Sequence, residues 1–123
     1  MGEVSVNKLL VAPGIPLYQA KAEFFRTLGH PVRIRVLELL ADGPKPVHAL
    51  LADLAIEASS LSQQLAVLRR AGIVTATRES TTVVYAMGGP DIAELMLAAR
   101  RFLTGMLADQ QDLLAELRGS RSR

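Results

Sequence analysis

Between residues 59 and 78, the sequence concentrates side chains that form hydrogen bonds or carry positive charge. These are Ser59, Ser60, Ser62, Gln63, Gln64, Arg69, Arg70 and Arg78. Serine and glutamine can hydrogen-bond the edges of DNA bases, and arginine can bind bases or phosphate groups. From Ala58 to Pro90 the only acidic residue is Glu79. Because carboxylates repel phosphates, this distribution indicates a surface that contacts nucleic acid.

The spacing of the leucines in the same stretch indicates a helix with one buried face. At about 100° per residue, one side of this helix would hold Ala58, Leu61, Leu65 and Leu68. The opposite side would hold Ser59, Gln63, Ala66 and Arg70. We expect the first side to face the core, Ser59 and Gln63 to reach bases, and Arg70 to reach phosphate. The alternative is an ordinary polar face exposed to solvent.

Elsewhere the chain lacks the residue sets that metal sites and active sites need. It has no cysteine and only two histidines, His30 and His48, whereas transition metals prefer thiolate and imidazole ligands. A structural role is expected for His30, which precedes Pro31. There is no Ser/His/Asp or Cys/His set and no glycine-rich phosphate loop. We therefore expect a protein that is not an enzyme and that uses no metal ion or other cofactor.

The overall composition indicates one small domain. The chain has 123 residues, of which 50% are hydrophobic and 4% are aromatic, so its core must consist mainly of aliphatic side chains. The net charge of +2 depends on three arginines in the last six residues and is weak evidence for nucleic acid. The apolar run at residues 9–12 is too short for a signal peptide or a membrane span. We expect a cytoplasmic protein that does not contact membranes.

Hydrophobic periodicity and turn residues predict the elements that position these groups. Residues 1–16 end in a segment rich in proline and glycine and are expected to form an N-terminal arm. Helices are predicted over residues 17–28, 31–42, 47–54 and 59–71, strands over 73–78 and 82–87, and a last helix over 91–117. Residues 118–123 are expected to form a basic disordered tail. The domain proper is thus residues 17–117.

This order of elements is typical of a winged helix-turn-helix. Two helices separated by a turn of about four residues are followed by a two-stranded hairpin, which would form the wing. We therefore predict a mostly α fold with a small β-hairpin wing, five helices, and dimerisation through the terminal helices.

The last helix carries an apolar stripe that is longer than one domain can cover. A continuous helix over residues 91–117 would span about 40 Å, although Gly105 leaves its continuity open. We expect a homodimer whose interface includes Phe24, Phe25, Leu95, Met96, Ala99, Phe102, Leu103 and Met106. A small organic inducer could bind at this dimer seam, although such a set of residues more often forms plain interface packing.

Residues 25–87 resemble the ArsR/SmtB family of bacterial winged-helix repressors. The resemblance rests on LGHPVRIRVLELL (residues 28–40), SSLSQQLAVLRRAGIV (residues 59–74) and VVYAM (residues 83–87). It implies a homodimer that binds an operator and blocks transcription until a signal releases it. The thiolate and histidine ligands of the family's metal sites are missing, which leaves a non-metal signal, with an organic inducer as the leading candidate.

The chain departs from the family pattern at three places near the expected DNA surface. Ala55 stands where glycine is common, Ala66 where a basic residue is common, and residues 80–82 are Ser-Thr-Thr where the wing tip usually carries glycine and arginine. Contact with the DNA backbone would then depend more on Arg69, Arg70 and Arg78.

Two functions are consistent with this sequence. The first is a sequence-specific DNA-binding transcriptional regulator, a homodimeric repressor that binds an inverted-repeat operator. The alternative is a winged-helix protein-interaction module, such as an accessory subunit or an antitoxin-like partner, without specific operator binding.

Overall fold

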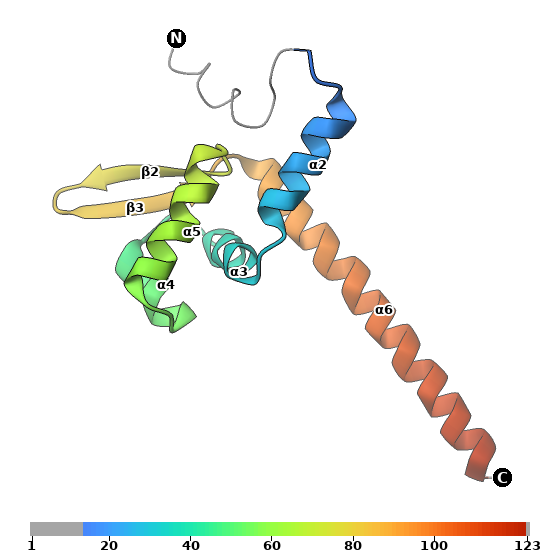
Figure 1. Ribbon diagram of the computed structural model, residues 1–123. Helices are drawn as coiled ribbons and strands as arrows, with labels where there is room; N and C mark the ends of the chain where they lie inside the picture. Colours follow the sequence, from blue (N-terminus) through green and yellow to red (C-terminus); the bar gives the residue numbers. More distant parts are fainter. Residues whose placement is uncertain (1–13, 123) are drawn as a thin grey trace. The chain divides into compact units, whose positions relative to one another are not determined.

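The computed structural model describes residues 14–122, so most of the N-terminal arm lies outside the described residues. The described elements are α2 (Leu17–Leu28), α3 (Pro31–Leu40), β1 (Lys45–Pro46), α4 (Val47–Leu54), α5 (Ala58–Arg70), β2 (Val74–Glu79), β3 (Thr82–Met87) and α6 (Pro90–Ser122) (Figure 1). The chain divides into two compact units, one ending at Ala93 and the other formed by the rest of α6 from Glu94. Five helices and a small sheet confirm the predicted winged helix-turn-helix class.

The junction between α2 and α3 follows from three consecutive residues. Gly29 ends α2, and His30 caps α3 by accepting a hydrogen bond on its Nδ1 atom from the backbone N–H of Val32 at 3.2 Å. Pro31 occupies the first turn of α3, where its missing N–H costs nothing. The expected structural role of His30 is confirmed as that of an N-cap.

The core of the first unit lies between α3, α4, α5 and the sheet. Its largest fully buried side chains are Val36, Leu37, Leu40, Leu50, Leu61, Leu65, Leu68 and Val74. Helix α3 contacts α4, α5 and β3, and α5 also contacts β2. The hairpin is therefore anchored on the same core that holds the two helices of the helix-turn-helix.

The sheet has three strands in the order β1-β3-β2, all antiparallel. Strands β2 and β3 pair from Val74↔Met87 to Glu79↔Thr82, so the loop between them is shorter than the three residues expected. Strand β1 was not predicted: Lys45 pairs with Tyr85, and Pro46 with Val84, in the segment between the helices predicted over residues 31–42 and 47–54. A two-residue edge strand tolerates proline and is too short to show alternation.

Helix α6 is one continuous helix of 33 residues, about 50 Å long at 1.5 Å per residue. It is not broken at Gly105, and it passes the expected end at residue 117 to reach Ser122. The prediction of a disordered tail from residue 118 is therefore wrong up to Ser122.

The second unit exposes its apolar residues. Every residue from 97 to 119 is solvent-exposed, and the large apolar ones are Leu97, Phe102, Leu103, Met106, Leu107, Leu113, Leu114 and Leu117. Within residues 14–122, no helix is long and apolar enough to cross a membrane.

Candidate nucleic-acid interface

Helix α5 presents two different faces, as its leucine spacing predicts. Leu61, Leu65 and Leu68 are at most 1% exposed. The residues expected on the opposite side, Ser59, Gln63, Ala66 and Arg70, are all exposed. Ala58 is also exposed, although it was expected in the core, because it is the first residue of the helix and lies beyond the packed turns. The polar face of α5 is thus exposed to solvent, as contact with a DNA groove requires.

The residues predicted to contact DNA differ in their surroundings. Seven are exposed, namely Ser59, Ser60, Ser62, Gln63, Arg69, Arg70 and Arg78. Gln64 is half-buried, and its Oε1 atom accepts a hydrogen bond from Nε of Arg33 at 2.7 Å. The amide oxygen of Gln64 is therefore already engaged within the protein.

The positive charges lie at one end of α5 and on the wing. Arg69 and Arg70 occupy the last turn of α5, and Arg78 lies on β2, where it pairs with Val83. The ion pairs Arg26–Glu23 and Arg35–Glu38 involve other arginines. The three arginines predicted to contact phosphate thus lie at the C-terminal end of α5 and on the hairpin.

The turn between α4 and α5 is short and contains a strained residue. Helix α4 ends at Leu54, and Ala55 adopts a left-handed conformation with φ 54° and ψ 43°. Glu57 precedes α5 and makes no side-chain capping bond. Since left-handed backbone favours glycine, this geometry gives a physical reason why glycine is common at this position, where the chain has Ala55.

The wing extends past α5, with its loop directed away from that helix (Figure 1). Ser80, at the tip, has a positive φ of 61°. At the other end, the backbone N–H of Gly88 donates to the carbonyl oxygen of Ile73 at 2.8 Å. This bond therefore closes the hairpin at its base, next to the segment that follows α5.

Metal-ligand geometry is not found in the part of the chain that the structure describes. No group of three or more His, Cys, Asp or Glu residues comes together there as a metal site requires. His48 is exposed near the start of α4, and Nδ1 of His30 is used by the α3 cap.

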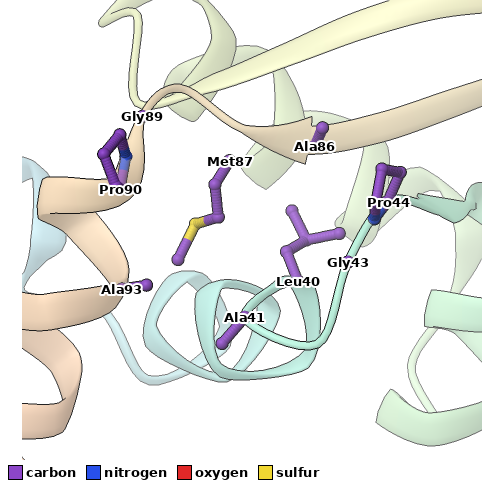
Figure 2. Close-up of a pocket in the computed structure, with 9 residues that line it drawn as sticks. All are labelled: Leu40, Ala41, Gly43, Pro44, Ala86, Met87, Gly89, Pro90 and Ala93. Carbon is purple, nitrogen blue, oxygen red and sulfur yellow. The ribbon is translucent and has the colours of Figure 1, made fainter.

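A shallow apolar hollow of about 420 Å³ lies near the base of the wing. Its lining residues are Leu40, Ala41, Gly43, Pro44, Ala86, Met87, Gly89, Pro90 and Ala93. In Figure 2, the side chains of Leu40 and Met87 approach each other across the hollow. None of the lining residues is charged or belongs to the expected dimer seam, so this hollow is not the inducer site predicted from the sequence.

The residues predicted at a dimer interface lie on α2 and α6. On α2, Phe24 is half-buried and Phe25 is 55% exposed, and their rings meet edge-to-face with centroids 5.3 Å apart. On α6, Leu95 and Met96 are half-buried, and Ala99, Phe102, Leu103 and Met106 are exposed. Both helices thus keep apolar surface outside the core.

Comparisons with known proteins match the chain to bacterial regulators. Residues 30–76 match the family model of the arsR family of bacterial regulatory proteins. The uncharacterized HTH-type transcriptional regulator Rv0081 of Mycobacterium tuberculosis (strain H37Rv) is 51% identical over 108 residues, which are 87% of this chain and 95% of that protein.

Solved structures give the same result. The crystal structure of M. tuberculosis Rv0081 matches with a TM-score of 0.72 and 52% identity, over 79% of this chain and 98% of that chain. A solution structure of a homodimeric winged helix-turn-helix DNA-binding domain from Mycobacterium bovis matches with a TM-score of 0.68 and 27% identity, over 78% of this chain and 94% of that chain.

Proposed function

The chain belongs to the ArsR family of bacterial regulatory proteins, and from this premise we propose that it is a homodimeric repressor that binds an inverted-repeat operator. As a member of that family it is a DNA-binding transcriptional regulator and not an enzyme. Beyond this family function, we propose the oligomeric state, the symmetry of the operator, the residues that contact DNA and the kind of signal that releases the protein.

The polar face of α5 carries the proposal. In a helix-turn-helix, the second helix enters the major groove and its N-terminal residues contact base edges. Ser59 and Gln63 are exposed on the first turns of α5, and they are suited to hydrogen bonds with bases. Arg69, Arg70 and Arg78 would bind phosphates on either side of the groove.

The homodimer is supported by the apolar surface of α6. Large side chains such as Phe102, Leu107 and Leu113 are 57–68% exposed, and an apolar surface of this extent marks an interaction site. A second copy related by a two-fold axis would present a second α5, and inverted-repeat operators have the same symmetry. The matching M. bovis domain is described as homodimeric.

The proposed signal is not a metal ion. Thiolates are absent from the sequence and histidines number two, and one of these caps a helix through its ring nitrogen. An organic inducer at the dimer seam remains our candidate for the signal. Titration of the operator complex with Zn²⁺ and Ni²⁺ at equal concentrations tests whether the signal is a metal ion. Release of the protein from DNA by either ion would contradict the proposal of a non-metal signal.

Footprinting and gel-shift measurements with the DNA upstream of its own gene test the central proposal. We expect protection of an inverted repeat, and loss of binding in the double variant Gln63→Ala/Arg70→Ala. The matched control is Gln19→Ala/Arg26→Ala, which removes the same two side chains at the same spacing from the exposed surface of α2. If the wild-type protein binds no duplex at low salt, the alternative of a protein-interaction module is favoured instead.

A further inference from the structure

Arg33 bridges the end of α2 and the middle of α5. Its Nη1 atom donates to the carbonyl oxygen of Thr27 at 2.9 Å, and its Nε atom donates to Oε1 of Gln64 at 2.7 Å. Arg33 lies near the start of α3 and is half-buried, as are Thr27 and Gln64. One side chain therefore connects three helices of the first unit.

The bond to Thr27 completes the C-terminal end of α2. The last turn of a helix leaves carbonyl groups without partners inside the helix. Here the carbonyl of Arg26 accepts from Gly29 N–H at 3.1 Å, and that of Leu28 accepts from His30 N–H at 2.7 Å. Arg33 supplies the donor for the carbonyl between them, and its positive charge also stabilises the negative end of the helix dipole.

The bond to Gln64 bears on a different property, the rotation of α5 about its axis, because it joins α5 to α3. Gln64 lies at the boundary between the buried leucines and the exposed polar face. Packing of leucines is largely non-directional, whereas a hydrogen bond from a planar guanidinium fixes both distance and angle. The Arg33–Gln64 bond therefore adds a directional restraint on the rotation of α5 to the packing of its leucines.

We propose that Arg33 is a positioning residue for operator binding, acting through Gln64 to hold α5 at the rotation that presents Ser59 and Gln63 to the bases. Through Thr27, the same guanidinium ties that rotation to the end of α2, the helix that carries Phe24 and Phe25. This inference rests on the proposed function, and it assigns to Gln64 a role within the protein in place of base contact.

A double-mutant cycle on operator affinity tests the proposal. The variants are Arg33→Ala, Gln64→Ala and their combination, titrated against a labelled duplex of the upstream DNA and checked for folding by circular dichroism. Each single variant should weaken binding about tenfold, because each removes a charge-assisted hydrogen bond. The double variant should be no weaker than the worse single one, since both remove the same bond. If the loss of affinity in the double variant equals the product of the two single losses, the proposal is overturned.

The salt dependence of binding separates positioning from direct phosphate contact. Arg33→Ala should weaken binding by the same factor at every salt concentration, whereas Arg70→Ala should lower the slope of log K against log salt by about 0.9. Equal loss of slope in both variants would show that Arg33 itself binds phosphate and would overturn its positioning role. Arg35→Ala is the matched control, because Arg35 is an exposed arginine on the same helix, paired with Glu38, and should leave affinity unchanged.

Three further outcomes lead to different conclusions. If Arg33→Ala does not fold, Arg33→Lys replaces it in the cycle, because lysine keeps the charge but lacks the planar fork that reaches both acceptors. If the wild-type protein binds no duplex, the proposed function fails and this role fails with it. If the wild type binds and the cycle shows no coupling, only the role of Arg33 fails.

Discussion

Gly88 lies against the backbone of Gly72, so closely that a Cβ atom on Gly88 would overlap the Gly72 carbonyl oxygen. The same Cβ would come within 2.9 Å of the carbonyl oxygen of Ile73, which already accepts the N–H of Gly88. The base of the wing and the segment that follows α5 thus meet through close backbone contact.

Gly88→Ala should consequently destabilise the protein by about 1–3 kcal/mol, the usual cost of inserting atoms into a packed site. The obstructing atoms are backbone, which cannot move aside as a flexible side chain can. Gly89→Ala is the control, because nothing lies within 4 Å of a Cβ at the next position. Thermal or urea unfolding measures both variants, and equal stability of the two would contradict the close approach.

Ala55→Gly should stabilise the protein by up to about 1 kcal/mol, because Ala55 holds a left-handed conformation that costs an L-residue about that much. The observed φ of 54° lies in this region. The same substitution at Ala52, an exposed residue within α4, should destabilise by about 1 kcal/mol. Opposite signs in the free energies of unfolding are the expected result, and a loss of stability at both positions would refute it.

His30→Ala should destabilise the protein by about 1 kcal/mol through loss of the α3 cap. His30→Asn should restore most of that stability, since an asparagine oxygen can accept the Val32 N–H in place of Nδ1. His48→Ala removes the other histidine, which is exposed, and should change little. If His30→Asn is no more stable than His30→Ala, the ring contributes by packing and not by capping.

Sequence patterns predicted the elements that have strong periodicity or clear end residues. The bounds of α2 and α4 and the buried face of α5 follow from apolar spacing, glycine and proline. Strand β1 was not predicted because Lys45 and Pro46 show no local pattern of apolar and polar residues that indicates a strand. Their pairing with β3 is set by tertiary structure.

The candidate site was also predictable where it depends on helical spacing, and not where it depends on contacts between distant residues. Exposure of Ser59, Gln63 and Arg70 follows from helical angles, because the opposite face is needed for the core. The engagement of Gln64 with Arg33 joins residues 31 positions apart, and no local rule relates them. Two adjacent glutamines, Gln63 and Gln64, therefore look alike in sequence although they differ in surroundings.

The proposed dimer yields a last prediction from the spacing of residues along α6. Alternating steps of four and three residues connect Ile92, Met96, Ala99, Leu103, Met106, Gln110, Leu113 and Leu117. This is the spacing of a coiled-coil seam, in which a single polar residue specifies register at a cost in stability. Gln110 is the one polar member of the seam.

Gln110→Leu should therefore tighten the homodimer, by about tenfold or more, because it removes two polar side chains from a face that the second copy would cover. Gln111→Leu is the matched control, since it makes the same change on the same exposed helix, at a position rotated by about 100° from the seam. Sedimentation equilibrium measures both dissociation constants. If neither leucine changes the dimer, or both change it equally, the two chains do not pair along this seam.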